Sequence, residues 1–289
     1  MKTYALFLVV WACFLFVAFG TPPAHAQTKQ DILVLGDSQI SASGGNLYLD
    51  FFGDLERQCS YSSSERAILE QLGAQRVGAI GVSSTSLRAW TARSGGHKDR
   101  ICAPNKRFGV NAGVFGFQGS DTRRYVQIGE GRDYQLCQPN RSPLQNALRD
   151  GYYDPELLVM ALLGNDAGRW ANNANAARAD ILEMMSQIPE DIGCIMLTTA
   201  PVFQKSTNDL RERAQRNLER AFRNENPRCV LVSGFSARTR DAIEGRPQFF
   251  ARREDGSIRD PLHPQTGAMQ RFFDINRPAL CAAVIEALK

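Results

Sequence analysis

Five short apolar runs bounded by turn residues alternate with helical patterns along this chain, and that alternation limits its fold more than any other feature. Short continuous apolar runs are typical of strands buried on both faces, which occur in parallel sheets with helices on each side. The sequence therefore predicts an α/β fold with a mainly parallel five-stranded sheet and helices on both faces. The expected strands are residues 32–35, 77–82, 157–163, 194–199 and 229–233.

The segments between these strands indicate helices. Residues 174–188 and 208–224 separate the last three expected strands, and apolar residues recur on one face of the second segment. We expect that face to pack on the sheet and the charged opposite face to be solvated. A final helix is expected over residues 278–288. Because 43% of the residues are apolar, the chain can bury one sizeable core, so we expect a single domain over residues 27–289.

Residues 88–150 interrupt the alternation, because they are rich in glycine, asparagine, arginine and aromatic residues and have no helical period. So long a connection inside a compact domain usually has a function or a small structure of its own. We interpret the segment as a loop-rich insertion over the carboxyl ends of the strands. It includes an expected hairpin at residues 125–137 that turns at residues 129–131. A disulfide between Cys102 and Cys137 is one way in which it could be pinned.

The N-terminus carries the long apolar stretch of the chain. Residues 5–20 hold no charge, and the chain then turns through two prolines into Ala24-His25-Ala26. This order predicts a signal peptide over residues 1–26 with cleavage after Ala26, and hence a periplasmic or secreted protein with no stable membrane anchor. The alternative, an N-terminal membrane anchor, is less favoured because a bilayer span needs roughly 20 apolar residues. Cys13 lies inside the stretch, which does not favour a lipid anchor.

Cysteine usage agrees with export. Six cysteines remain after removal of residues 1–26, and an even number is typical of disulfide pairing in an oxidising compartment. The sequence alone favours one pair, Cys194 with Cys229, because each opens an apolar run of neighbouring expected strands. The alternative is two buried free thiols. The six are Cys59, Cys102, Cys137, Cys194, Cys229 and Cys281.

Composition and spacing exclude several classes of function. No CxxC or Cys/His spacing typical of zinc occurs, and only His97 and His263 remain after the signal peptide. We therefore expect no metal and no cofactor. The 34 basic and 30 acidic residues are mixed along the chain, so we expect no nucleic-acid partner. His97 lies in a polar loop and is expected to be solvated.

A serine follows the first expected strand, at the edge of the sheet where open α/β folds bind ligands. The strand ends in Gly36-Asp37-Ser38, and Asp260-Pro261-Leu262-His263 follows near the far end of the chain. A hydroxyl becomes a nucleophile when a base takes its proton, and an acid holds that base in the correct tautomer. Ser38, His263 and Asp260 fit these three roles. The alternative for Ser38 is to cap the following helix.

The third expected strand is followed by Gly164-Asn165-Asp166 at the same edge. A fixed side-chain amide aimed at a developing oxyanion can lower the barrier by roughly 3–4 kcal/mol. Asn165 is a candidate for that donor, although a simple turn is the alternative. We expect Asp37 and Asp166 to bond the backbone of their own turns.

These three motifs, in this order, resemble those of the SGNH or GDSL hydrolases. The resemblance implies a flavodoxin-like three-layer sandwich, with Ser38 as nucleophile, Asn165 in the oxyanion hole, and Asp260 and His263 as acid and base. Residues 198–201, Thr-Thr-Ala-Pro, are similar to the family as well. Ser84 stands where the family has a glycine whose backbone N–H joins the oxyanion hole together with that of Ser38. The hole can survive this replacement if the position does not need a positive φ.

Two hypotheses of different class follow. The first is an exported serine esterase or deacylase that acts through an acyl enzyme on an acylated carbohydrate or envelope polysaccharide. Two variants of this first hypothesis use the same serine: transfer of the acyl group to a sugar hydroxyl, and cleavage of a different bond of an envelope glycan. The second is a glycan-binding protein that has kept the fold without turnover, which the Ser84 replacement favours. Aromatic residues of the insertion suit a sugar, and Arg123, Arg124 and Arg132 suit an anionic group; alternatively they only pack and solvate the loop.

Overall fold

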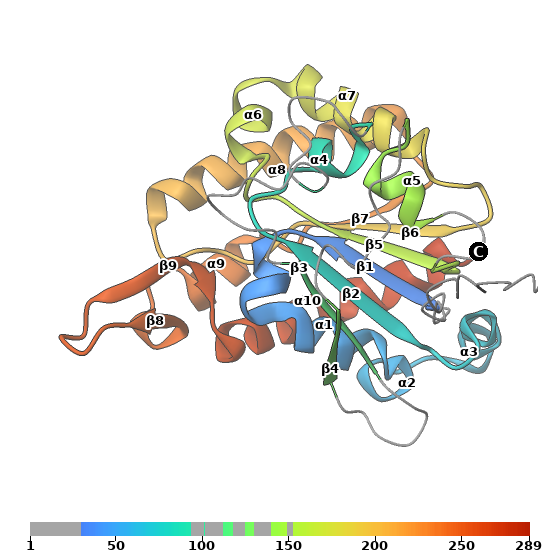
Figure 1. The fold of residues 1–289 in the computed structure, drawn as a ribbon, viewed down its shortest axis with the longest axis horizontal. Coiled ribbons are helices and arrows are strands. Elements are labelled where there is room, and N and C mark those ends of the chain that lie inside the picture. The colour runs from blue at the N-terminus through green and yellow to red at the C-terminus, as the bar shows by residue number, and fades with distance from the viewer. Residues whose placement is uncertain (1–29, 94–100, 102–111, 118–124, 130–139, 149–152) are drawn as a thin grey trace, which may run out of the picture.

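The computed structural model describes residues 30–93, 101, 112–117, 125–129, 140–148 and 153–289 (Figure 1). Its centre is a seven-stranded sheet in the order β4-β3-β2-β1-β5-β6-β7. The five neighbouring strands β2, β1, β5, β6 and β7 run parallel. The predicted α/β fold with a parallel five-stranded sheet is confirmed. The strands of this sheet are β1 (Ile32–Gly36), β2 (Val77–Val82), β3 (Ala112–Phe117), β4 (Tyr125–Gly129), β5 (Leu157–Ala161), β6 (Gly193–Leu197) and β7 (Val230–Val232).

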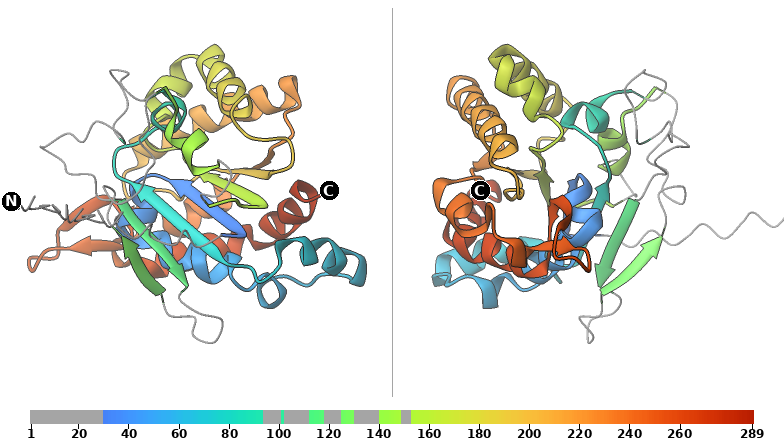
Figure 2. Two further views of the ribbon diagram at one scale, coloured as in Figure 1. Left: turned by 45° about the vertical axis from the view of Figure 1, so that its right-hand side comes forward. Right: turned by 90° about the vertical axis from the view of Figure 1, so that its left-hand side faces the viewer.

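Helices cover both faces of the sheet, in layers that Figures 1 and 2 show from three sides. Alternate strand residues enter two separate cores, so that Leu33 packs toward one helix layer and Ile32 toward the other. The first layer comprises α4 (Leu87–Thr91), α5 (Pro143–Ala147), α6 (Ala167–Asn172), α7 (Ala174–Met185) and α8 (Lys205–Glu225). The second comprises α1 (Gly45–Phe52), α2 (Leu55–Gln58), α3 (Ser63–Leu69), α9 (Ala237–Ile243) and α10 (Thr266–Ala287).

The register of the parallel strands aligns their carboxyl ends. Gly36, the last residue of β1, is paired with Gly81 of β2 on one side and with Ala161 of β5 on the other. The segments that follow these three strands therefore leave the sheet at one edge. Segments far apart in the sequence are brought together there, as in open α/β folds generally.

The insertion differs from its prediction in the part that the structure describes. Residues 112–117 and 125–129 form β3 and β4, which extend the sheet beyond β2 as antiparallel strands. Residues 125–129 pair with the preceding strand β3, and the turn and second arm of the predicted hairpin, residues 130–137, lie outside the described residues. These two strands widen the sheet and do not lie over its carboxyl ends. The proposed Cys102–Cys137 disulfide lies outside the described residues.

The last helix is twice as long as expected. The sequence placed its start at Pro278, whereas α10 begins at Thr266 and contains that proline. Proline is typical of a first helical turn, because it lacks an N–H to donate. Here buried residues on both sides of it, Phe272 and Leu280 among them, pack in the same core and keep the helix continuous.

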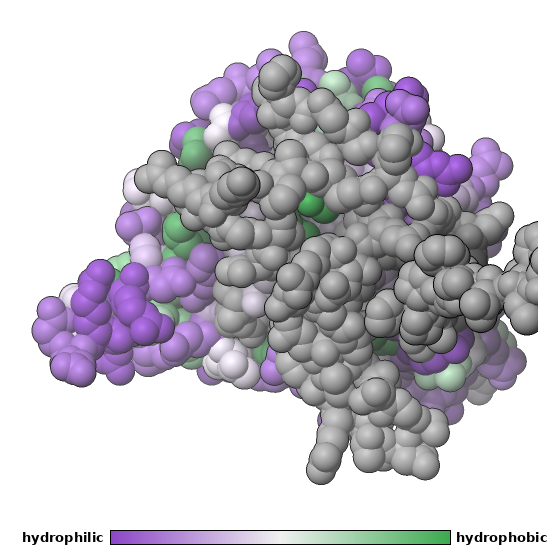
Figure 3. All heavy atoms as spheres, viewed as in Figure 1, coloured by the Kyte–Doolittle hydropathy of each residue, from purple (hydrophilic) through white to green (hydrophobic). Residues whose placement is uncertain are grey.

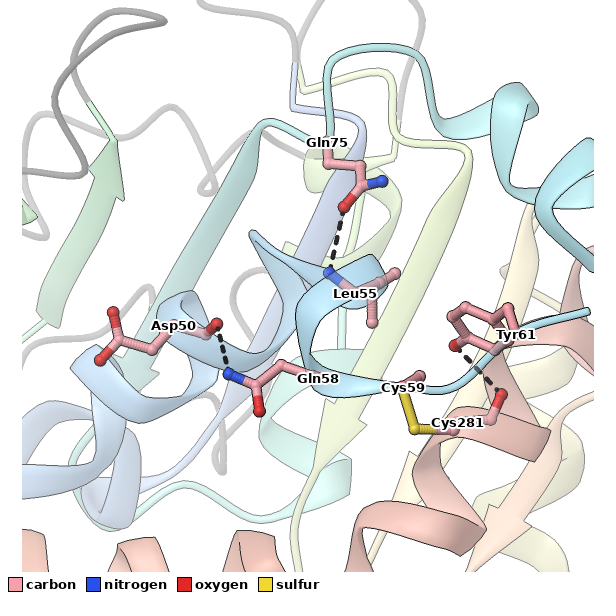
Figure 4. The surroundings of a disulfide bond; sticks show 7 residues. All are labelled: Asp50, Leu55, Gln58, Cys59, Tyr61, Gln75 and Cys281. Atoms are coloured by element: carbon pink, nitrogen blue, oxygen red, sulfur yellow. Dashed lines mark hydrogen bonds between the residues drawn. A yellow bond between two sulfur atoms is a disulfide. The ribbon is translucent and has the colours of Figure 1, made fainter.

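Two disulfides lie among the described residues. Cys194 and Cys229 join β6 to the start of β7, which confirms the pair that the sequence favours. Cys59 and Cys281 join the end of α2 to α10, and Tyr61 beside them donates its hydroxyl to the Cys281 carbonyl at 3.3 Å (Figure 4). Both are compatible with a secreted or periplasmic protein.

A small hairpin leaves the body of the molecule beside the carboxyl edge of the sheet. It consists of β8 (Phe250–Arg252) and β9 (Ile258–Pro264), and the turn between them is exposed and charged. Figure 3 shows this arm as strongly hydrophilic at the left of the molecule. The described residues also include the short helical turns η1 (Ile40–Gly44), η2 (Glu70–Leu72) and η4 (Pro247–Phe249).

Within the described ranges, no helix combines the length and the apolar character that crossing a bilayer requires. The predicted signal peptide, residues 1–26, lies outside these ranges.

Candidate functional site

Ser38 lies at the first turn of a helical segment that starts directly after β1. Asp37 caps this turn, because its Oδ1 accepts from the Gln39 N–H at 2.9 Å and its carbonyl accepts from Ile40 N–H at 3.1 Å. The Ser38 hydroxyl is therefore not used as the helix cap. Within the described part of the chain, neither this hydroxyl nor the Ser38 backbone N–H has a hydrogen-bond partner, and the residue is only half-buried.

Asp260 and His263 form a hydrogen-bonded pair on β9. Asp260 Oδ2 and His263 Nδ1 are 2.8 Å apart, and Asp260 Oδ1 accepts from the His263 backbone N–H at 3.1 Å. Burial alone would raise the pKa of Asp260, but the hydrogen bond and charge of His263 and the N–H of Leu262 hold it below its ordinary value. The ionised carboxylate thus fixes one ring nitrogen and leaves Nε2 available.

The pair lies close to the Ser38 turn. β9 packs against η1, the turn that follows Ser38, and His263 interacts electrostatically with Asp37. No hydrogen bond joins Ser38 to His263 among the residues described, so the contact expected of a closed Ser-His-Asp arrangement is not formed. Catalytic hydrogen bonds are often long without substrate and tighten when it binds.

The loops after β2 and β5 meet beside the same turn. Asn165 donates its side-chain amide to the Thr85 carbonyl at 2.8 Å, and the Thr85 hydroxyl lies 3.4 Å from the carbonyl of Gly36 at the end of β1. An amide group has two hydrogens, so one remains available after this bond. Ser84, which precedes Thr85, is exposed, and its N–H has no acceptor in the described part of the structure.

Ser84 adopts a left-handed backbone conformation, with φ of 62°. The position therefore does take the positive φ that a glycine accommodates more easily, and the condition that φ be negative there is not met. Such strain in a non-glycine residue persists where the surroundings hold it, and it clusters at functional sites.

Gly81, at the carboxyl end of β2, lets the Ser38 turn come close. A Cβ at this position would lie 2.4 Å from the Ser41 backbone nitrogen and 2.8 Å from the Asp37 carbonyl oxygen. The Ser41 and Ser83 hydroxyls are 3.3 Å apart across the same gap. The loop that carries Ser84 is thus packed directly on the turn that carries Ser38.

The two neighbouring acids behave differently. Asp37 bonds its own turn, as expected, whereas Asp166 accepts from the Leu87 backbone N–H at 3.0 Å and so caps α4. The expectation that Asp166 bonds its own turn is wrong, because the nearby start of α4 offers a donor without a partner. Burial raises the pKa of Asp166 well above its ordinary value, more than the Leu87 N–H lowers it.

Gln39 is a site residue that sequence reasoning missed. Its side-chain amide donates to the Ala200 carbonyl and accepts from the Ala200 N–H, each at 3.0 Å. It thereby fastens the Ser38 turn to the loop after β6. Its place directly after Ser38 was visible, but its partner lies 161 residues away and no local pattern points to it. His97 and Arg123, Arg124 and Arg132 lie outside the described residues.

The fold and these side chains define an α/β sandwich with a half-buried serine, an aspartate–histidine pair and an amide gathered at the carboxyl edge of its sheet. No family model and no curated protein matches the chain. Among solved structures, it is similar to a DUF4886 family protein from Bacteroides uniformis, with 12% identity and a TM-score of 0.46. The match covers 91% of this chain and 83% of that one. At this distance the likeness adds nothing about activity.

Proposed function

We propose that the protein is an exported serine hydrolase of the SGNH type, an esterase or deacylase that acts on an acylated carbohydrate. The observation that carries the proposal is the 2.8 Å hydrogen bond between Asp260 and His263, on a strand that packs against the Ser38 turn. An activated nucleophile consists of a serine, a histidine and an acid that holds the histidine in place. The Ser38 hydroxyl makes no hydrogen bond to a described residue, so it is available for this role.

The reaction follows from these roles. His263 Nε2 takes the proton of Ser38 as Oγ attacks the ester carbonyl, and then gives it to the leaving alcohol. An acyl enzyme on Ser38 remains, and His263 activates a water that releases the acid. The Ser38 and Ser84 N–H groups and the Asn165 amide are the donors for the oxyanion of each tetrahedral intermediate. No metal or cofactor enters this scheme.

Two features support an acylated carbohydrate as the substrate. Leu262, the residue before His263 on β9, is 45% exposed, and an exposed apolar side chain so close in sequence to the histidine suits an acyl group. By composition alone, the aromatic residues of the insertion suit a sugar and its arginines suit an anionic group. The disulfides fit the expected periplasmic or extracellular location, where envelope polysaccharides occur.

A glycan-binding protein without turnover is the second candidate. The strained Ser84 and the unformed Ser38–His263 hydrogen bond favour it. Acyl transfer to a sugar hydroxyl uses the same residues, and it differs from hydrolysis only in the acceptor.

The test uses the chain without residues 1–26, incubated with p-nitrophenyl acetate and with a fluorophosphonate probe. We expect ester hydrolysis and labelling in the wild type, and loss of both in Ser38→Ala and His263→Ala. Ser186→Ala, an exposed serine at the end of α7, is the matched control and should behave as the wild type. Labelling that persists in Ser38→Ala, or a wild type without labelling or hydrolysis, would contradict the proposal, and the second outcome would favour the binding protein.

A further inference from the structure

A buried arginine links the loops around the candidate site, although sequence reasoning did not include it. Arg211, on α8, is only 6% exposed, and its Nη1 donates to the Ala200 carbonyl at 2.8 Å. The same carbonyl accepts from Gln39, the residue after Ser38, at 3.0 Å. One acceptor after β6 therefore joins Arg211 to the turn that carries the nucleophile.

The guanidinium also lies against the loop after β5. A Cβ at Gly164 would come within 2.4 Å of Arg211 Nη2, closer than side chains tolerate. Gly164 directly precedes Asn165, so the position of the candidate oxyanion donor depends on the space that this glycine leaves to the arginine. Arg211 thus contacts two of the loops that form the carboxyl edge.

Arg211 and Asp37 are opposite charges buried under the site. Burial raises the pKa of Asp37, whereas the Gln39 N–H and the charges of Arg211 and His263 lower it. Burial likewise lowers the pKa of Arg211 to about 10, against the charge of Asp37. The Nε of Arg211 is buried and has no partner among the described residues. Burying a cation with so few hydrogen bonds is unfavourable for folding, which indicates a task other than stability.

We propose that Arg211 is a positioning residue of the site, which holds the Asn165 loop and the Ala200 loop against the Ser38 turn and provides the positive charge opposite Asp37. This inference rests on the proposed hydrolase function. Arg211 acts through its neighbours, because Asp37 caps the Ser38 turn and its negative charge favours the protonated His263 that forms during attack.

The proposal predicts a pH effect. The charged or titratable groups that act on Asp37 are Arg211 from α8, His263 from β9, Tyr48 from α1 and Asp166 after β5. Arg211 is the permanent cation among them. Loss of the Arg211 charge raises the pKa of Asp37, so that the carboxyl group becomes protonated at a higher pH than in the wild type. Activity that needs the Asp37 carboxylate is then lost at a higher pH as the solution is acidified.

The test compares Arg211→Met and Arg211→Lys with Arg213→Met, an exposed arginine on the same helix, as the matched control. Hydrolysis of p-nitrophenyl acetate is measured across pH together with the melting temperature. We expect Arg211→Met to lower kcat by about tenfold or more with a smaller change in KM, and to move the acid limb upward by about one pH unit. Arg211→Lys keeps the charge, so its activity should fall on the acid side at the same pH as that of the wild type. Gly164→Ala displaces the guanidinium and should lower kcat without moving that limb.

Two results keep failure of this inference apart from failure of the hydrolase proposal. If the wild type hydrolyses the ester and a folded Arg211→Met variant has the same kcat and pH profile as the wild type, the positioning role is overturned. A second measurement needs no catalysis: the urea midpoints of Asp37→Asn, Arg211→Met and the double variant. We expect the double variant to lose less in urea midpoint than the sum of the losses of the two single variants. Strictly additive losses would overturn the proposal even in an inactive protein.

Discussion

At the scale of single residues, the decisive feature of Gly36-Asp37-Ser38 is that Asp37, and not Ser38, caps the helical turn that follows. Asp37 caps the helix with its side chain, and this leaves the hydroxyl of Ser38 free of any bond to a described residue. A serine that caps its own helix has its oxygen occupied by a backbone N–H. The neighbour thus explains why Ser38 is a candidate nucleophile rather than a structural serine.

Asp260→Asn tests the acid at this scale. Asparagine removes the charge and permits the wrong tautomer of His263, so kcat on p-nitrophenyl acetate should fall by up to about 10⁴-fold with little change in KM. Because the pKa of Asp260 is lowered by folding, its contribution to stability is present above 3.8 and is lost as the pH falls through the lowered value. The control is Asp255→Asn in the exposed turn of the hairpin, and equal activity in the two variants would contradict the role of Asp260.

Ser84→Gly tests the backbone strain. Glycine accepts a φ of 62° without a Cβ conflict, so the free energy of unfolding should rise by up to about 1 kcal/mol, and activity should persist because the N–H remains. The control is Ser86→Gly, whose φ of −104° needs no glycine, and urea denaturation should show it to be less stable than the wild type. A destabilised or inactive Ser84→Gly would show that the serine side chain is required.

At the scale of elements, the apolar runs were sufficient to predict the parallel sheet, because buried strands have a composition that local sequence reveals. β2 was predicted to the residue, while the other parallel strands differ by up to two residues at their ends. The antiparallel β3 was missed, since a glycine-rich segment such as Ala112–Phe117 has no strand pattern and depends on its partners, whereas β4 was expected as a hairpin arm and not as part of the main sheet. In the site, Ser38, Asn165, Asp260 and His263 stand in local motifs. Gln39 and Arg211 act through partners distant in sequence, which no local pattern reveals.

The disulfide between Cys59 and Cys281 offers a prediction for the elements it joins. It connects α2 to α10 across a sequence separation of 222 residues, compared with 35 for Cys194–Cys229. Because a longer closed loop restricts the unfolded chain more, the Cys59→Ala/Cys281→Ala variant should lose about 2–4 kcal/mol in urea denaturation. Esterase activity at a temperature where the variant is folded should be unchanged, since the disulfide is remote from the carboxyl edge. Unchanged stability would show that α10 packs without the link.

At the scale of the whole molecule, the sheet brings the candidate site together. Ser38, Asn165 and His263 come from segments separated by more than 90 residues each, and the aligned ends of β1, β2 and β5 place the first two at one edge. The hairpin of β8 and β9 brings the third to the same edge. The cost of this arrangement is a set of buried carboxyl groups beneath the edge, Asp37 and Asp166, whose pKa values are both raised mainly by burial.

These buried acids give the molecule a pH-dependent stability. A carboxyl group with a raised pKa binds its proton more tightly in the folded state than in the unfolded state. Its contribution to the free energy of unfolding therefore falls as the pH rises from 3.8 through the raised pKa. We expect the melting temperature of Asp166→Asn to exceed that of the wild type at pH 8 and the difference to shrink toward pH 4, because asparagine can still accept from Leu87 without a charge. Asp241→Asn, an exposed acid, should show no such trend. A difference independent of pH would show that the charge of Asp166 is not the cause.

The proposed activity depends on Ser38 as an activated nucleophile, and the position of a covalent adduct is the sharpest test of that role. The protein is treated with a fluorophosphonate, digested and mapped by peptide mass spectrometry, with the His263→Ala variant alongside. We expect one adduct in the wild type, on Ser38, and a strongly slowed reaction in the variant. An adduct on another residue, or equal labelling of Ser38 without the histidine, would contradict that role.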